Sequence, residues 1–302
     1  MTLARKGFRA SALEDVHDRL LEWFAPRVRA YPWRIRPTPY RVLVSEVMLQ
    51  QTQAGRVVPH YRSFLKRFPS VRALAAAPLS DVIRAWSGLG YNRRAVALAS
   101  AARAIVRDHG ARVPPDPAAL RRLPGIGPYT AAAVASLGHG LAVPLVETNV
   151  RRILSRAALG REPGDVSTKH LEEVATSWLD AAHPVEWNQA LMDLGREVCR
   201  PAPLCDACPI RTRCRSAGRR DRPAATHPPQ PRFEGSFRQT RGRVISVLSE
   251  RGDVSVAALA RATGEPIARL SEAIEALAAD GLVRAGPAAR AGAPRGRVRL
   301  AS

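Results

Sequence analysis

Two glycines separated by a single residue connect two segments whose apolar residues recur at helical spacing. They lie in the stretch Leu123-Pro124-Gly125-Ile126-Gly127-Pro128-Tyr129-Thr130. This pattern predicts two helices joined by a tight turn. Gly125 and Gly127 lack a Cβ and tolerate positive φ, so the backbone amides beside them can face an anion. Pro128 suits the first turn of a helix, whose N-terminus attracts phosphate. The stretch therefore predicts a phosphate-binding turn, with a purely structural corner as the alternative.

The charge balance indicates a polyanionic partner. The chain has 302 residues, with 47 Lys and Arg against 26 Asp and Glu, for a net charge of +21. This excess is spread along the chain, which is typical of a nucleic-acid footprint rather than a basic tail. No apolar run is long enough to span a membrane, and the N-terminus lacks the apolar core of a signal peptide. We therefore expect a bacterial protein of the cytoplasm, associated with the nucleoid and not with a membrane.

The periodicity predicts an all-α first domain, because no stretch before residue 217 alternates with period two. The helices expected there cover residues 12–29, 40–53, 56–67, 79–86, 92–109 and 117–122. Prolines make residues 217–236 an extended linker. Residues 237–302 predict three helices and a hairpin, which is a small winged-helix-like α+β domain. Such a domain can bind DNA, contact a protein or serve a purely structural role.

The four cysteines are gathered between residues 199 and 214, as Cys199, Cys205, Cys208 and Cys214. In a reducing compartment, four clustered thiols indicate a metal site rather than disulfides. Tetrahedral zinc and a [4Fe–4S] cluster both accept four cysteines, and the spacing does not decide between them. Because protein ligands would fill every position, we expect a structural role for this metal.

The turn, a carboxylate about 20 residues later and the four-cysteine loop together resemble the helix-hairpin-helix DNA glycosylase superfamily. Within that superfamily the MutY-type adenine glycosylases, which remove adenine mispaired with 8-oxoguanine or guanine, are the most similar. The resemblance covers about residues 12–216 and rests on Pro32-Trp33-Arg34, Ser45-Glu46-Val47-Met48-Leu49-Gln50-Gln51-Thr52-Gln53, Gly88-Leu89-Gly90-Tyr91 and Met192-Asp193-Leu194-Gly195. It implies a two-lobed, all-α glycosylase domain over residues 1–216, with a [4Fe–4S] cluster in the 199–214 loop.

The resemblance assigns Glu46 as the main catalytic residue. A glycosylase must flip the target nucleotide out of the duplex and then cleave its N-glycosidic bond. Glu46 would protonate adenine N7 and then activate water, as the acid does in glycoside hydrolysis. That role asks for a carboxyl pKa raised by burial, which the neighbours Val44, Val47 and Met48 favour.

Glu147 stands where the family has its second catalytic carboxylate, an Asp. By resemblance Tyr129 hydrogen-bonds this carboxylate and Asn149 orients it. The added methylene moves the carboxylate by about 1.5 Å, and a misplacement of about 1 Å can cost roughly a hundredfold in rate. The alternative is that Glu147 only caps the helix that starts near Asn149, where a negative charge is favourable.

The resemblance also implies which residues contact double-stranded DNA containing a mispair. Leu49 and Gln50 would wedge into the duplex and Tyr91 would intercalate, holding the strand kinked while a base is out. For Leu49 and Tyr91, ordinary core packing is the alternative. The full set of expected DNA contacts is Arg34, Leu49, Gln50, Gln51, Tyr91, Gly125 and Gly127. We expect the chain to bind DNA as a monomer.

We expect a monofunctional enzyme, because related lyases carry a Schiff-base Lys where this chain has Tyr129. One alternative is a glycosylase of the same fold for thymine or uracil opposite guanine, which the Leu49-Gln50-Gln51 segment disfavours. Another is a catalytically impaired protein that binds lesions. The Nudix-like pattern that reads 8-oxoguanine in many family members is not found, and residues 237–302 instead resemble the short C-terminal region of actinobacterial members.

Overall fold

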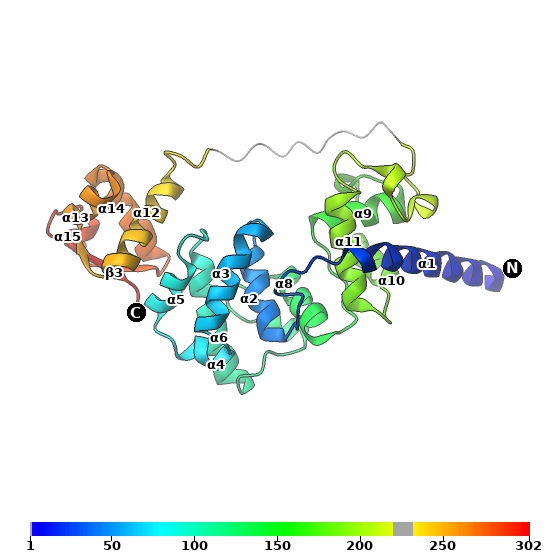
Figure 1. The fold of residues 1–302 in the computed structure, drawn as a ribbon, viewed down its shortest axis with the longest axis horizontal. Coiled ribbons are helices and arrows are strands. Elements are labelled where there is room, and N and C mark those ends of the chain that lie inside the picture. Colours follow the sequence, from blue (N-terminus) through cyan, green and yellow to red (C-terminus); the bar gives the residue numbers. More distant parts are fainter. Residues whose placement is uncertain (1, 220–231) are drawn as a thin grey trace. The chain divides into compact units, whose positions relative to one another are not determined.

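The computed structural model describes residues 2–219 and 232–302, with side chains from residue 12 onward (Figure 1). It forms two compact units, each assembled from segments far apart in the sequence. Unit 1 comprises Met1–Leu43, Pro115–Pro117 and Gly127–His227, and unit 2 comprises Val44–Pro114, Ala118–Ile126 and Pro228–Ser302. Parts of the predicted linker, residues 220–231, lie outside the described residues.

The regular elements in the described residues of unit 1 are all helices. Its helices are α1 (Thr2–Phe24), η1 (Ala25–Arg27), the start of α2 (Pro39–Leu49), α8 (Pro128–Ala133), η2 (Val134–Gly138), α9 (Thr148–Leu159), η3 (Pro163–Asp165), α10 (Thr168–Trp178), α11 (Pro184–Glu197), η4 (Cys205–Ala207) and η5 (Arg211–Arg213). The end of α9 at Gly160 takes a left-handed conformation, which glycine adopts without the steric cost of a Cβ.

The core of unit 1 joins the N-terminal helix to helices more than a hundred residues later. Leu20 on α1, Ile153 on α9 and Trp187 on α11 are each almost completely buried in it. Three of the four cysteines pack against the same cluster. Burying such side chains stabilises the fold by about 1.5–3 kcal/mol each, so α1 is an integral part of this unit.

Unit 2 contains the remaining helices of the predicted first domain. After the end of α2 these are α3 (Ala54–Arg67), α4 (Val71–Ala76), α5 (Leu79–Trp86), α6 (Arg93–His109) and α7 (Pro117–Arg121). Aromatic side chains fill its centre: Phe64 packs edge-on against Trp86, with ring centroids 5.9 Å apart. Apolar residues of α6, including Leu98 and Ile105, are fully buried beside them.

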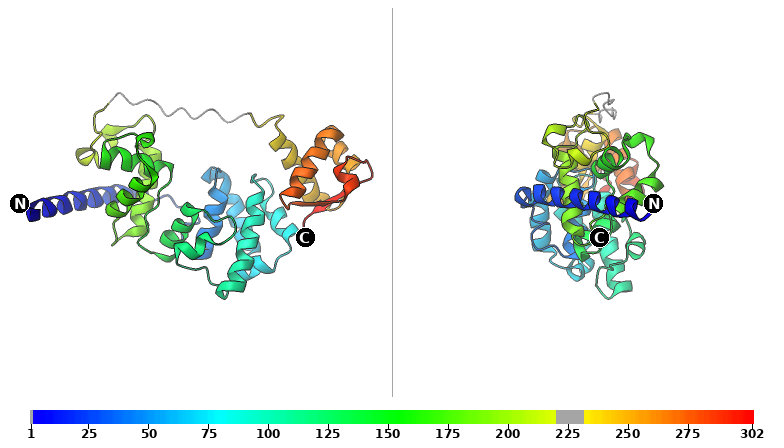
Figure 2. Two further views of the ribbon diagram at one scale, coloured as in Figure 1. Left: turned by 180° about the vertical axis from the view of Figure 1, so that it is seen from behind. Right: turned by 90° about the vertical axis from the view of Figure 1, so that its right-hand side faces the viewer.

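The C-terminal part of unit 2 combines helices with one small sheet. Its elements are α12 (Phe237–Arg251), β1 (Val254–Ser255), α13 (Val256–Thr263), α14 (Ile267–Ala279), β2 (Val283–Ala285), α15 (Pro287–Arg290) and β3 (Arg297–Leu300). The strands are antiparallel in the order β1-β3-β2, with Val254 opposite Val298 and Val283 opposite Leu300. Figure 2 shows this part (orange to red) from two further sides.

The predicted fold class is confirmed. Strands in the described residues occur only after residue 253, and helices with a small sheet follow as expected. The largest differences in helix boundaries concern two helices: α2 ends at Leu49 rather than Gln53, and the expected helix over 12–29 starts earlier and ends at Phe24. The early end of α2 has a backbone cause, because Gln51 adopts a φ of +54°, which an α-helix does not accept.

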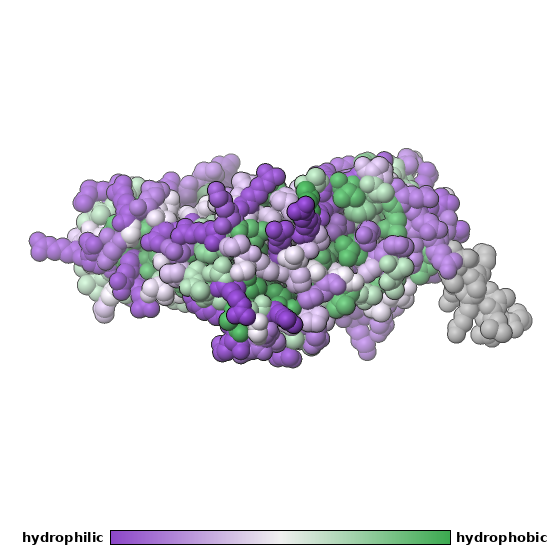
Figure 3. Space-filling view, turned by 60° about the horizontal axis from the view of Figure 1, so that its bottom comes forward, coloured by the Kyte–Doolittle hydropathy of each residue, from purple (hydrophilic) through white to green (hydrophobic). Residues whose placement is uncertain are grey.

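Hydrophilic side chains dominate the face shown in Figure 3, with apolar residues visible in smaller patches between them. Within the described residues, no helix has the length and apolar character needed to cross a membrane.

Candidate active site and four-cysteine loop

Glu46 is a buried carboxylic acid on the largely apolar helix α2. Its residue is 5% exposed, while its neighbours Val44, Val47 and Met48 are exposed by 2% or less. Helix α2 therefore packs its second half into the core of unit 2 and takes Glu46 with it. The Glu46 carboxyl group therefore lies among apolar side chains and is largely removed from solvent.

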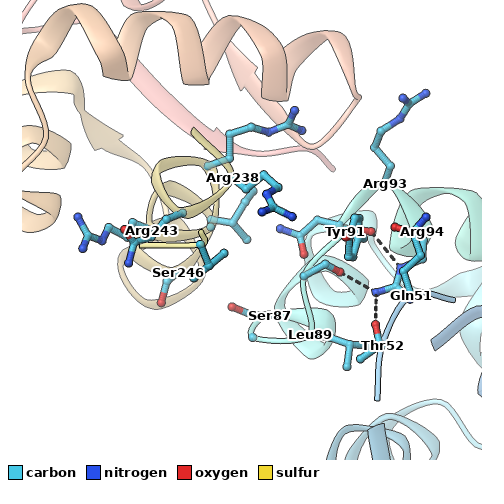
Figure 4. A pocket seen from close by; sticks show the side chains of 18 of the residues that line it. Gln51, Thr52, Ser87, Leu89, Tyr91, Arg93, Arg94, Arg238, Arg243 and Ser246 are labelled. Carbon is cyan, nitrogen blue, oxygen red and sulfur yellow. Dashed lines mark hydrogen bonds between the residues drawn. The ribbon is translucent and has the colours of Figure 1, made fainter. Parts of the chain in front are cut away.

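Arg94, on α6, holds the end of the helix that carries Glu46. It is 9% exposed, and its guanidinium donates to the carbonyl of Met48 at 2.8 Å and to that of Gln50 at 2.6 Å. Further acceptors are the carbonyls of Val47, Gly90 and Tyr91 and the hydroxyl of Thr52. Figure 4 shows Arg94 between the 50–53 and 87–92 loops. Burial lowers the pKa of Arg94 to about 10, so it stays charged at neutral pH.

Two residues at this site are held in left-handed conformations. Gln51 has φ +54° and Tyr91 has φ +50°, both uncommon for residues with a Cβ. The Tyr91 side chain is 42% exposed and stacks near Arg94, whose guanidinium carbon lies 5.3 Å from the ring centroid. Leu49 and Gln50 are half-buried, and Gln51 is exposed. The structure thus gathers four of the expected DNA contacts around one buried guanidinium.

The two glycines of the Leu123–Thr130 stretch differ in what they require. Gly125 has φ +74°, and a Cβ there would lie 2.5 Å from the Cβ of Ala97, so only glycine fits. Gly127 has an ordinary φ, and a Cβ added there would meet nothing within 4 Å; it is the N-cap residue of α8, with Pro128 as the first helical residue. Both glycines are exposed, which leaves the turn accessible to a ligand.

Glu147 is the N-cap residue of α9. Its Oε1 accepts hydrogen bonds from the backbone amides of Asn149 at 2.8 Å and Val150 at 2.9 Å. The side-chain amide of Asn149 donates to its Oε2 at 3.2 Å. Burial raises the pKa of Glu147 above its ordinary value, although these hydrogen bonds and the charge of Arg152 act in the opposite direction. The capping geometry and the carboxylate–asparagine contact that the sequence predicted occur together.

A hydrogen-bond network connects Glu147 to the start of the cysteine loop. Asn149 Oδ1 accepts from Arg152 Nη2 at 2.7 Å, and Arg152 Nε donates to the carbonyl of Cys199 at 2.6 Å. Arg152 also donates to the carbonyl of Gly195. A Cβ on Gly195 would lie 2.5 Å from the Cβ of Asn149, so α9 and α11 can touch here only because residue 195 is glycine.

Asn188, which the sequence analysis missed, fixes the segment leading to Glu147. Its Oδ1 accepts from the amide of Leu145 at 2.9 Å, and its Nδ2 donates to Ser136 Oγ and to the carbonyl of Val143, each at 2.9 Å. Asn188 is 1% exposed. The sequence signal for this role is a polar side chain on the apolar face of the helix over residues 184–197, because a buried polar group needs hydrogen-bond partners.

Arg34 pairs with Asp193 inside unit 1. The two parallel contacts measure 2.8 and 3.1 Å, and both side chains are largely buried. Arg196 donates to the same carboxylate. Arg34 thus forms a bidentate ion pair with the aspartate of the Met192–Gly195 motif, and its predicted contact with DNA stays a prediction. Tyr129 lies half-buried on α8.

The four cysteines line one shared cavity beside Ile153, Leu194 and Ile210. All four are free thiols and half-buried. In the described residues, no three side chains of Cys, His, Asp or Glu are placed to bind one metal ion together. Four thiols around one cavity are a donor set that both tetrahedral zinc and a [4Fe–4S] cluster accept.

Known proteins match the segments that carry Glu46, Glu147 and the four cysteines. Residues 44–179 match the HhH-GPD superfamily of base excision DNA repair proteins. The adenine DNA glycosylase of Mycolicibacterium smegmatis is 39% identical over 274 residues, covering 87% of this chain and 91% of that protein. The chain belongs to the adenine DNA glycosylase family. The resemblance inferred from sequence motifs is thereby confirmed.

Other family members share different parts of the chain. The Mycobacterium tuberculosis adenine DNA glycosylase is 40% identical and covers 87% of this chain, more than residues 1–216 could supply, so the match reaches the C-terminal region. The human adenine DNA glycosylase is 40% identical over 66% of this chain and 39% of its own length.

Solved structures agree on the fold. A thermostable thymine-DNA glycosylase has a TM-score of 0.64 and 29% identity, covering 69% of this chain and 98% of its own. Endonuclease III in a non-covalent DNA complex has a TM-score of 0.58 at 21% identity, covering 70% of this chain and 95% of its own, a likeness of fold alone.

Proposed function

We propose that this chain is a monofunctional DNA glycosylase that hydrolyses the N-glycosidic bond of adenine mispaired with 8-oxoguanine or guanine. The observation that carries the proposal is the match to mycobacterial adenine DNA glycosylases over 87% of the chain. The net charge of +21 suits a duplex DNA substrate. Protonation of the base and stabilisation of the sugar are the two tasks that the reaction sets.

Glu46 is assigned the proton transfers. It is a buried acid on a helix whose C-terminal end is fixed by hydrogen bonds from Arg94. It protonates adenine N7, the C–N bond then breaks, and the same group, now a carboxylate, accepts a proton from the attacking water.

Glu147 is assigned the stabilisation of positive charge on the deoxyribose. Asn149 and the backbone amides of α9 hold its carboxylate in one orientation before any charge develops. A fixed counter-charge avoids reorganisation during the reaction, which is why such groups contribute strongly to catalysis. Tyr129 stands where a lyase would carry its Schiff-base lysine, so bond cleavage by water is the proposed chemistry, with no lyase step.

Cys199, Cys205, Cys208 and Cys214 are proposed to hold a [4Fe–4S] cluster. When bound, such a cluster cross-links the loop and brings no reactivity that base hydrolysis requires. Arg152 and Arg156 donate to the carbonyls of Cys199 and Arg200 and place positive charge beside the loop. Purified protein should absorb broadly near about 400 nm, and stoichiometric zinc without iron after anaerobic purification would contradict the assignment.

The organisation proposed for the chain is a glycosylase domain over residues 1–216, a linker over 217–236 and a winged-helix-like domain over 237–302. The protein acts as a monomer on the bacterial chromosome, in the cytoplasm. In the glycosylase domain, Leu49, Gln50, Gln51 and Tyr91 contact the duplex beside the mispair, and the turn with Gly125 and Gly127 binds its backbone.

A panel of synthetic duplexes tests the proposal. Purified protein is incubated with duplexes containing A:8-oxoG, A:G, T:G, U:G or A:T, and abasic sites are then cleaved with alkali. The account predicts strand cleavage at adenine opposite 8-oxoguanine or guanine only after alkali. Release of thymine or uracil would identify a same-fold glycosylase for another base, as the thymine-DNA glycosylase neighbour illustrates. Tight binding without any release would identify a lesion-binding protein.

A further inference from the structure

A large basic groove lies within unit 2, between α12 and the loops that carry Gln50, Gln51 and Tyr91 (Figure 4). Its volume is about 1490 Å³, above the range of about 300–1,000 Å³ typical of small-molecule pockets. One wall comes from the predicted glycosylase domain and the other from the C-terminal region. In Figure 4, Arg238 and Tyr91 lie on these two opposing walls.

The charge of the groove is strongly positive. Its described lining residues include a single carboxylate, Asp280, and seven arginines: Arg56, Arg93, Arg94, Arg232, Arg238, Arg241 and Arg243. Asp280 pairs with both Arg93 and Arg241, and Glu265, outside the lining, pairs with Arg243. Two carboxylates thus face seven guanidiniums. An imbalance of this size attracts a polyanion, and arginine suits phosphate because its planar fork donates two parallel hydrogen bonds.

Exposed aromatic side chains mark the same groove. Tyr91 is 42% exposed, Phe233 is 53% exposed and Phe237 is 38% exposed, and all three line it. They are the exposed aromatic residues of the chain within residues 12–219 and 232–302. Apolar rings left in water beside arginines are typical of surfaces on which nucleic-acid bases stack. A binding site for free phosphate or an acidic peptide would have no need for these rings.

We propose that this groove binds a short unpaired segment of a DNA strand, with phosphates on its exposed arginines and bases stacked on Tyr91, Phe233 and Phe237. The inference rests on the proposed function, because a duplex kinked around an extruded nucleotide offers unstacked bases next to the site. The C-terminal region then contributes directly to substrate binding: α12 supplies one wall of the DNA site, and the wedge loops supply the other.

Binding of a labelled single-stranded pyrimidine oligonucleotide to the full-length protein, measured by fluorescence anisotropy, tests this inference. The oligonucleotide contains no mispair, so the result does not depend on base release. Phe233→Ala combined with Phe237→Ala should weaken binding by about tenfold or more through lost stacking. Arg238→Ala should reduce the slope of log affinity against log salt by about 0.7 for one lost phosphate contact.

Matched controls remove a similar group outside the groove. Ile267→Ala truncates an exposed apolar side chain on α14, and Arg261→Ala removes an exposed charge on α13. Both should bind the oligonucleotide with an unchanged salt slope. Thermal unfolding shows whether each variant folds; if the double phenylalanine variant does not, Arg238→Glu at an exposed position takes its place and should weaken binding by at least tenfold.

Several results would overturn the inference. Groove variants that fold and bind like wild type would do so, as would equal losses in the groove variants and the controls. Wild-type protein that binds polyglutamate but does not bind the oligonucleotide would indicate an acidic protein partner instead. The proposed function can fail separately from this inference. If the groove variants lose oligonucleotide binding but wild type releases no adenine, the groove binds DNA and the glycosylase activity is disproved.

Discussion

Asn149 donates to Glu147 twice, from its backbone amide to Oε1 at 2.8 Å and from its side chain to Oε2 at 3.2 Å. Glutamate is not among the preferred N-cap residues, because a shorter side chain reaches these amides more easily. Here the longer side chain caps α9 through Oε1 and accepts a second hydrogen bond at Oε2 from the Asn149 side chain. The local structure therefore fits a glutamate at the position where the family resemblance implies an aspartate.

Shortening this side chain is expected to slow base release. Glu147→Asp withdraws the carboxylate by about 1.5 Å from the Asn149 side chain and from the position in which it stabilises the sugar. We expect a rate lower by about one to two orders of magnitude in single-turnover adenine release, following the cost of misplacing a catalytic group. A faster Asp variant would show instead that the wild-type site is impaired by glutamate.

The pKa of Glu147 predicts two pH effects. Burial raises it above the ordinary value of 4.5, so as pH falls the carboxylate becomes protonated, and adenine release declines, beginning at a pH above 4.5. The folded state holds this proton more tightly than the unfolded state, so the bound proton stabilises the folded state. This contribution is complete below pH 4.5 and disappears as pH rises through the raised pKa of Glu147.

The Glu147→Gln variant lacks this titration. Its Tm relative to wild type should therefore increase as pH rises through that window, measured by thermal unfolding between about pH 4 and pH 8. A constant difference in Tm would contradict the raised pKa.

Gly195 is expected to position Glu147 from a distance. Gly195→Ala places a Cβ 2.5 Å from the Cβ of Asn149, which must move and take the Glu147 carboxylate with it. We expect adenine release to fall by about a hundredfold and the free energy of unfolding to fall by about 1–3 kcal/mol. Gly164→Ala, where nothing lies within 4 Å of the added Cβ, is the control and should change neither quantity. Equal behaviour of the two variants would exclude this role.

Arg94 is expected to be a major contributor to the stability of unit 2. Arg94→Met keeps most of the side-chain volume but leaves the carbonyls of Met48 and Gln50 without their donor. We expect the free energy of unfolding in urea to fall by about 3 kcal/mol. The adjacent Arg93, whose side chain is 77% exposed, provides the control, since Arg93→Met should change it by less than about 0.5 kcal/mol. Similar losses in both variants would show that the buried contacts contribute little.

The sequence was sufficient wherever the determining interactions are local. The turn at Gly125 follows from glycine conformation, the all-α first domain from apolar periodicity, and the gathering of the cysteines from their spacing. The helix cap at Glu147 could also be predicted from sequence, because the backbone amides that donate to it belong to residues two and three positions later.

Long-range contacts of buried polar groups were not accessible in this way. Arg94 resembles its exposed neighbour Arg93 in sequence, yet only the fold brings it to carbonyls more than forty residues away. The requirement for Gly195 likewise comes from α9, a separate helix. Arg34 was assigned to DNA by motif alone, and its partner Asp193 lies 159 residues later. The catalytic and DNA-binding roles themselves stay predictions until variants are measured.

The Glu46→Gln variant separates proton donation by Glu46 from DNA binding. Glutamine keeps the size of this buried side chain but cannot supply the proton that adenine N7 must receive. In single-turnover reactions with an A:8-oxoG duplex, wild type should release adenine and Glu46→Gln should release none above background, while both bind the duplex with affinities within about threefold. Adenine release by Glu46→Gln at the wild-type rate would contradict the account.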